Sequence, residues 1–179
     1  MQKGFTLIEL LVVIALIAVL AVAVVLSLNP AELLKQGRDS TRISDLSAIE
    51  SALALYLVDV STPMLTSSTN CYVYGTVTTT CAGRFSSGAT NLVTSTSQAV
   101  DGSGWIPVNL TLMSSGSPLP RYPIDPTQSN PYFYAFRPSS TPGFYEINAQ
   151  LESSKYLTRQ QTDGGNNNNV YEVGNDLNL

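Results

Sequence analysis

The sequence contains no histidine, only two cysteines and few charged side chains. Without histidine, the commonest general base and the commonest metal ligand are both missing, and two cysteines cannot fill a four-ligand zinc site. Charged residues make up 12% of the chain, well below the roughly 25% of an average soluble domain. The net charge is −4, and no basic run offers the clustered Lys and Arg that phosphate contacts need. An enzyme and a nucleic-acid partner are therefore not expected.

Apolar residues form one long uninterrupted run near the N-terminus. From Phe5 to Leu28 the only ionisable side chain is Glu9. As an α-helix this run would be about 36 Å long, enough to cross a bilayer core of about 30 Å. Lys3 precedes it, which places the N-terminus in the cytoplasm by the positive-inside tendency. A secretory signal peptide has a shorter apolar core, so the run predicts a transmembrane helix.

Glu9 distinguishes this helix from a plain membrane anchor, which is the simplest alternative interpretation. A carboxylate inside a spanning helix is unfavourable by a few kcal/mol at the centre and by less near the edge. A plain anchor gains nothing from it. An intramembrane acid therefore indicates a function, with a partner that neutralises it.

The order Lys3-Gly4-Phe5-Thr6-Leu7-Ile8-Glu9 resembles the class III signal peptide of type IV pilins and of the major pseudopilins of type II secretion. In that family a prepilin peptidase cuts after the glycine, and the new N-terminal phenylalanine is N-methylated. The resemblance implies processing between Gly4 and Phe5, and it makes Glu9 the assembly glutamate of the mature chain. In a filament, Glu9 of one subunit would pair with the Phe5 amine of a neighbour, because buried charges are tolerated only when paired.

The resemblance also implies a location and a set of partners. The chain would be a single-pass precursor in the inner membrane and then part of an extracellular or periplasmic filament, either a type IV pilus or a secretion pseudopilus. Its partners would be further copies of itself in a helical homopolymer, the prepilin peptidase and methyltransferase, and an inner-membrane assembly platform. A minor pilin or a membrane-anchored binding protein, serving adhesion or the capture of a ligand or DNA, carries the same signal and stays an alternative.

A second helical segment is predicted beyond the apolar run. Pro30 predicts a kink or a short break, and Gly37 weakens the stretch that follows it. In some members of the family that the chain resembles, the helix partly melts on assembly, and the resemblance would place this at Asn29–Gly37. Apolar residues then recur at steps of three and four, which predicts an amphipathic helix to about Val58. They are Ile43, Leu46, Ile49, Leu53 and Leu57, and the predicted polar face holds Arg38, Asp39, Arg42, Asp45 and Glu50.

The resemblance implies an α+β fold shaped like a ladle, in which a long N-terminal α-helix packs on a small antiparallel β-sheet domain. Residues 1–4 would be the leader peptide, residues 5–58 the long helix with 5–28 as its transmembrane part, and residues 59–179 an extracytoplasmic β-rich head. The apolar stripe of the second helical segment is the predicted seat of that head.

Turn residues and β-prone runs alternate in the predicted head. The runs on either side of Gly75, 71–74 and 76–80, predict a hairpin closed by a disulfide between Cys71 and Cys81. Residues 85–98 are rich in Ser, Thr and Asn and predict a surface loop. Further along, residues 132–137 and 144–151 predict an antiparallel hairpin, residues 123–126 a turn, and residues 170–173 a last short strand.

The polar segment near the C-terminus is the only candidate for a metal site. Oxygen-bearing side chains next to a tight turn are typical calcium ligands, and some major pseudopilins carry a calcium loop near the C-terminus. The candidate ligands are Asp163, Asn166, Glu172 and Asp176. Their spacing matches no EF-hand, and a flexible polar loop without metal is the alternative. No cofactor is required for the predicted function.

Overall fold

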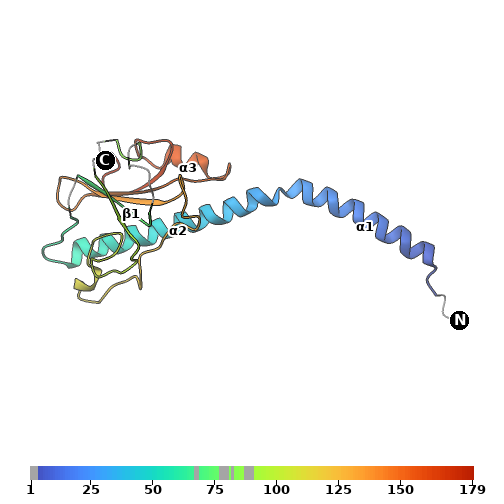
Figure 1. Ribbon diagram of the computed structural model, residues 1–179, viewed down its shortest axis with the longest axis horizontal. Coiled ribbons are helices and arrows are strands. Elements are labelled where there is room, and N and C mark those ends of the chain that lie inside the picture. The colour runs from blue at the N-terminus through green and yellow to red at the C-terminus, as the bar shows by residue number, and fades with distance from the viewer. Residues whose placement is uncertain (1–3, 67–68, 77–80, 82, 87–90) are drawn as a thin grey trace. The chain divides into compact units, whose positions relative to one another are not determined.

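The computed structural model describes residues 4–66, 69–76, 81, 83–86 and 91–179 (Figure 1). The chain divides into two compact units, Met1–Lys35 and Gln36–Leu179. We call them the N-terminal unit and the globular unit. Each has its own architecture.

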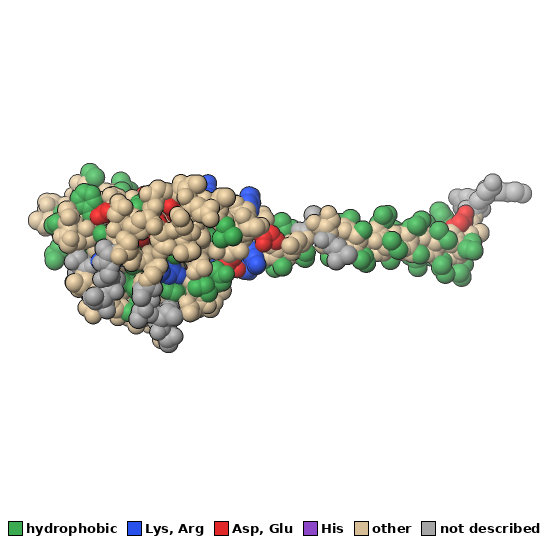
Figure 2. All heavy atoms as spheres, turned by 90° about the horizontal axis from the view of Figure 1, so that it is seen from above, with side chains coloured by type: hydrophobic (Ala, Val, Ile, Leu, Met, Phe, Trp, Pro, Cys, Tyr) green, Lys and Arg blue, Asp and Glu red, His purple; other side chains and the backbone are tan. Residues whose placement is uncertain are grey.

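The N-terminal unit consists of helix α1, Leu7–Leu28, and the first turns of helix α2, Pro30–Asp59. Leu7–Val25 is long and apolar enough to cross a membrane, with a mean hydropathy of 3.2, and hydrophobic side chains cover the visible face of α1 (Figure 2). Asn29 separates the helices in a left-handed conformation, with φ of 42°. Pro30 begins α2, where a helix does not need the missing N–H. The predicted break is therefore confirmed.

The globular unit combines the rest of α2 with one five-stranded sheet in the order β2-β1-β3-β4-β5. Neighbouring strands are antiparallel except for β1 and β2, which are parallel. A 3₁₀ turn η1 (Leu110–Leu112) and a short helix α3 complete the unit, and the strands are β1 (Asn70–Tyr74), β2 (Asn91–Ser95), β3 (Tyr134–Pro138), β4 (Tyr145–Ala149) and β5 (Tyr171–Gly174). Helix α3 spans Leu157–Thr162. The α+β prediction, a long N-terminal helix followed by a small and mostly antiparallel sheet, is confirmed.

One face of the sheet packs against α2. Leu46, Ile49 and Leu53 of the helix are buried in the same cluster as alternate residues of the strands, because side chains on a strand point to opposite faces in turn. The strand residues of this cluster include Tyr134, Phe136, Tyr145, Ile147 and Val173. The predicted apolar stripe is thus the seat of the sheet. Ile43 lies at its margin and is only partly buried.

The other face carries a smaller cluster that includes Cys71, Val73 and Ala135, covered by Phe85 and Leu179. The predicted disulfide between Cys71 and Cys81 is present. Of the hairpin predicted around Gly75, residues 77–80 lie outside the described residues, so the hairpin stays a prediction. Strand β1 itself pairs in parallel with β2 and, at Tyr72 and Val73, antiparallel with β3.

The structure confirms two further strand predictions and corrects one predicted loop. The hairpin of β3 and β4 is confirmed, with Tyr134 opposite Ala149 and Pro138 opposite Tyr145, and β5 confirms the last strand one residue later than predicted. The predicted loop at 85–98 was wrong in part, because its residues Asn91–Ser95 form β2. The composition of this polar segment does not distinguish a strand from a loop. The segment is extended because it pairs with β1.

Two charged residues of the predicted polar face are fully buried instead. The guanidinium of Arg42 donates to Asp39 at 2.8 Å and binds Asp125 through both oxygens, at 2.7 and 3.0 Å. It also lies 2.6 Å from Glu152. Asp39 in turn accepts the N–H and the hydroxyl of Ser153. The network joins α2 to segments 83 to 114 residues further along the chain.

The charges of this network shift the pKa values of its members. Hydrogen bonds from Arg38 lower the pKa of Glu152 to about 2, with a further contribution from Arg42. Burial by itself would lower the pKa of Arg42, but its bonds to Asp125, Glu152 and Asp39 outweigh burial and raise it. Asp125 lies in the predicted turn and also accepts the N–H of Thr127 at 2.7 Å. Its carboxylate therefore anchors both the turn and the helix.

Replacement of Arg42 should therefore lower the free energy of unfolding of the globular unit. The change Arg42→Ala leaves three carboxylates without their common cation, and breaking a buried ion pair in this way costs about 3–5 kcal/mol. The loss can be measured by urea unfolding of the detergent-solubilised chain, followed by the fluorescence of Trp105, the single tryptophan and a buried one.

Arg121 provides the matched control, because it is exposed. Arg121→Ala should change the free energy of unfolding by no more than about 0.5 kcal/mol. Equal losses in the two variants would show that the Arg42 network does not hold α2 on the sheet.

Candidate functional site

The segment directly before α1 is open and non-helical. Gly4, Phe5 and Thr6 have no regular secondary structure, Phe5 is 88% exposed, and no atom outside its immediate neighbours lies within 4 Å of where a Cβ of Gly4 would be. Exposed, irregular backbone is where proteases cut most readily. The peptide bond between Gly4 and Phe5 is therefore accessible to a peptidase.

Helix α1 begins with a capping box formed by Thr6 and Glu9. The backbone N–H of Glu9 donates to Thr6 Oγ1 at 3.3 Å, while the N–H and the hydroxyl of Thr6 both donate to Glu9 Oε2, at 2.8 and 2.7 Å. Such reciprocal bonds satisfy N–H groups that have no partner inside the helix. The helix thus starts two residues after the predicted scissile bond, and Thr6 and Glu9 define its start.

Only one oxygen of the Glu9 carboxylate takes part in this cap. Both bonds from Thr6 end on Oε2, and no hydrogen bond reaches Oε1 from the part of the chain that the structure describes. Beside the carboxylate lies a shallow hollow of about 350 Å³, lined by Phe5, Ile8, Val12 and Val13 together with Glu9 itself. The second oxygen is therefore free to accept a donor from outside the chain, in apolar surroundings.

The N-terminal segment also matches a family model. Residues 1–25 match the family model described as the prokaryotic N-terminal methylation motif. This motif is the class III signal peptide of type IV pilins. No curated protein and no solved structure matches the chain. The signal peptide implies a pilin-like or pseudopilin precursor that a prepilin peptidase processes, whereas the individual roles of Gly4, Phe5 and Glu9 stay predictions.

The four candidate calcium ligands take part in hydrogen bonds within the chain. Both oxygens of Asp163 accept backbone N–H groups, from Gly165 and from Glu172. The side-chain amide of Asn166 donates to Ser86, and Asp176 accepts from Asn178 and from Ser139. In the described ranges no group of three or more His, Cys, Asp or Glu is placed to hold a metal ion. Calcium binding by these four side chains stays a prediction.

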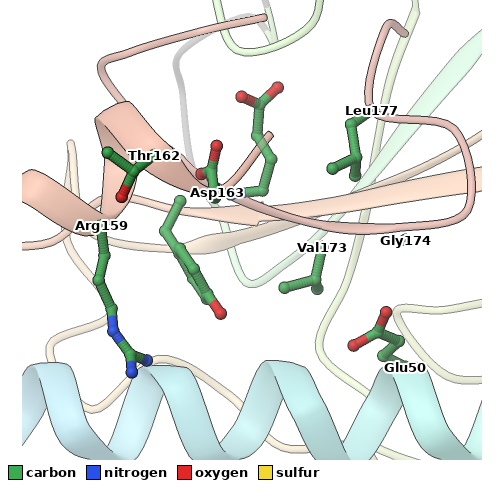
Figure 3. A pocket seen from close by; sticks show the side chains of 9 residues that line it. Glu50, Arg159, Thr162, Asp163, Val173, Gly174 and Leu177 are labelled. Atoms are coloured by element: carbon green, nitrogen blue, oxygen red, sulfur yellow. Dashed lines mark hydrogen bonds between the residues drawn. The ribbon is translucent and has the colours of Figure 1, made fainter. Parts of the chain in front are cut away.

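A hollow of about 480 Å³ lies beside β5, the edge strand of the sheet, and sequence analysis did not anticipate it. Figure 3 shows Glu50 on α2, with Arg159 extending toward the same helix and Thr162 and Asp163 on the opposite side. Partial burial raises the pKa of Glu50. Among the described residues, the lining of the hollow contains no nucleophile hydrogen-bonded to a base. The hollow therefore has no recognisable catalytic arrangement.

Sequence analysis also missed a pair of buried carboxylates, Glu146 on β4 and Glu172 on β5. Glu172 was considered only as a calcium ligand. Alternation along the strands could have placed each of them on the face away from α2, but the sequence does not show that β4 and β5 are neighbours.

The capping box can be tested with two substitutions of Thr6. Thr6→Val keeps the shape of the side chain but removes its hydroxyl, so the first turn of α1 should lose about 0.5–2 kcal/mol. Thr6→Ser retains the hydroxyl and should behave like the natural chain. Amide hydrogen exchange of residues 7–10 in detergent micelles measures the difference. Equal exchange rates in the Val and Ser variants would contradict the proposed cap.

Proposed function

We propose that this chain is the precursor of a filament subunit that is cleaved after Gly4, N-methylated at Phe5 and polymerised through α1 into a type IV pilus or a pseudopilus. The observation that carries this proposal is the order of features along the chain. A class III signal peptide leads through the accessible Gly4–Phe5 bond directly into an apolar helix, none of whose Leu7–Val25 window is buried.

The exposed surface of α1 supports polymerisation. Its Leu, Ile and Val side chains between Leu7 and Val25 are about half exposed or more. Each Å² of apolar surface exposed to water is unfavourable by about 25 cal/mol. Before assembly the inner membrane would cover it. In a filament the α1 helices of neighbouring copies would replace the lipid, and close packing of apolar helices would hold them together.

The geometry of Glu9 supports its role in assembly. Cleavage after Gly4 leaves the Thr6 N–H in place, so the capping bonds to Oε2 persist in the mature chain. Oε1 then accepts the N-terminal amine of Phe5 from a neighbouring copy. Because the two bonds use different oxygens, capping its own helix and binding a neighbour do not compete. The paired charges would be tolerated in the apolar core of a filament, whereas a lone Glu9 would not.

Intact mass and N-terminal peptide mapping of material sheared from the cell surface test this proposal. The expected chain lacks the four leader residues and begins with N-methylated Phe5. Recovery of the same mature chain only from membranes would indicate a pseudopilus or a minor pilin. A chain that keeps Met1-Gln2-Lys3-Gly4 in its native host would rule out processing.

The assembly role of Glu9 has its own test. Glu9→Gln should be processed like the natural chain, because the scissile bond is unchanged, but the sheared fraction should contain at least tenfold less of it, since the amide cannot neutralise an amine. Glu32→Gln, which removes an acid just beyond the apolar run, is the matched control and should assemble normally. Normal filaments from the Glu9→Gln variant would disprove the pairing.

A further inference from the structure

Exposed positive charge is scarce in the globular unit and is concentrated at one place. Acidic residues outnumber Lys and Arg in this unit. Most of its Lys and Arg side chains are buried or belong to the ion network of α2, namely Arg38, Arg42, Arg84 and Arg137. The other three, Arg121, Lys155 and Arg159, are exposed. Lys155 and Arg159 lie within one short stretch, at the start of α3.

Lys155 and Arg159 lie around the ring of Tyr156. The Lys155 ammonium is 5.0 Å from the centre of this ring, and the guanidinium carbon of Arg159 is 6.0 Å from it. Neither cation makes an ion pair with a carboxylate of the described residues. Leu157, next to the tyrosine, is 42% exposed. These four residues, which we call the basic patch, combine two positive charges with aromatic and aliphatic surface.

The fold holds the basic patch beside the first turns of α2 in the globular unit. The N–H and the hydroxyl of Ser153 both donate to Asp39, at 2.7 and 2.6 Å. Lys155 follows Ser153 by two positions, so their Cα atoms are at most about 7 Å apart. On the inner side of α3, buried Gln160 accepts the N–H of Leu151. The patch is thus fixed where the chain enters the globular unit.

The chain between this point and the membrane-spanning segment is short. The apolar window of α1 ends at Val25. The positions from Val25 to Asp39 span about 21 Å as a helix, and no more than about 50 Å when fully extended. In a membrane-anchored precursor, a bend at the helix break of Asn29 would therefore bring the basic patch to the bilayer surface.

We propose that the basic patch docks the globular unit of the precursor on anionic phospholipid headgroups of the membrane that α1 spans. This docking rests on the membrane-anchored precursor of the proposed function. Lys155 and Arg159 would bind lipid phosphates, while Tyr156 and Leu157 would lie at the boundary of headgroups and acyl chains, where such side chains are favoured. Docking would end when the chain leaves the bilayer for the filament.

The number of charges fits a tethered contact with lipid. Two cations at an anionic surface favour the docked state by on the order of thirtyfold. This is too little to recruit a free protein, but α1 keeps the patch close to the surface and so raises its effective concentration. The excess of acidic residues elsewhere in the unit would be repelled by the same surface. Charge therefore also selects which side of the unit faces the lipid.

Other anionic partners fit the patch less well. A nucleic acid needs more phosphate contacts than two cations supply. An acidic protein surface would gain little from two exposed ion pairs and would have no particular use for the exposed Leu157. A lipid surface accommodates both the charges and the apolar side chains.

Amide hydrogen exchange of residues 155–162 in the full chain, inserted in lipid nanodiscs at one copy per disc, tests the docking. These amides should exchange about fivefold or more slowly in discs that contain phosphatidylglycerol than in discs of phosphatidylcholine alone. Salt near 1 M should abolish the difference, because the Debye length falls to about 3 Å. Exchange in η1, a short helical turn of the same unit, should not depend on the lipid.

Variants assign the effect to the patch. The double variant Lys155→Gln/Arg159→Gln should exchange in anionic discs as the natural chain does in neutral discs. Arg121→Gln removes an exposed cation outside the patch and should keep the full difference. A difference that survives in the double variant would overturn the proposal. So would slowing that appears only in discs with several copies, which would assign the patch to a second copy of this chain.

The same experiment separates the docking from the proposed function. A chain that enters the discs through α1 and exchanges equally in both kinds of disc would contradict the docking alone. A chain that does not enter the discs would lack the anchor and overturn both proposals. Insertion can be measured independently, by flotation of the chain with lipid vesicles.

Discussion

The apolar surface of α1 is the constraint on which the rest of this protein depends. A helix with hydrophobic side chains on all sides must be covered by something outside its own unit, and lipid or other copies of the same helix are the two covers that its composition fits. Glu9 is compatible with both, because the capping box stabilises one of its oxygens within the chain. In the proposed filament, the carboxylate would therefore meet a neighbouring copy with one of its two oxygens already hydrogen-bonded.

In the globular unit, the later part of α2 is held on the sheet by polar as well as apolar contacts. The stripe around Leu46, Ile49 and Leu53 supplies burial, and the Arg42 network adds directional bonds to the segments at Asp125 and Glu152. A buried ion network of this kind is not a strong source of stability compared with apolar packing. It does set which segments α2 can accept, because any other register would leave charges unpaired.

Two glutamates of the globular unit have pKa values shifted in opposite directions. Glu152 lies beside two arginines, and its pKa falls to about 2. Glu146 lies beside another carboxylate in a buried position, and its pKa rises to about 8. The first group stabilises the fold once the pH is above about 4.5, and the second does so most below that value.

The sequence by itself determined the signal peptide, the apolar helix, the break at Asn29 and the buried stripe of α2. All of these depend on contacts between residues a few positions apart, and helical geometry sets such contacts whatever the rest of the chain does. The β3–β4 hairpin was predictable for the same reason. Only the tertiary structure decided that β1 lies between β2 and β3, that Arg42 meets Asp125, and that Glu146 meets Glu172. These contacts join residues far apart in the chain. Strand pairing brings the strands and the two glutamates together, the packing of α2 on the rest of the globular unit brings Arg42 to Asp125, and no local pattern encodes either.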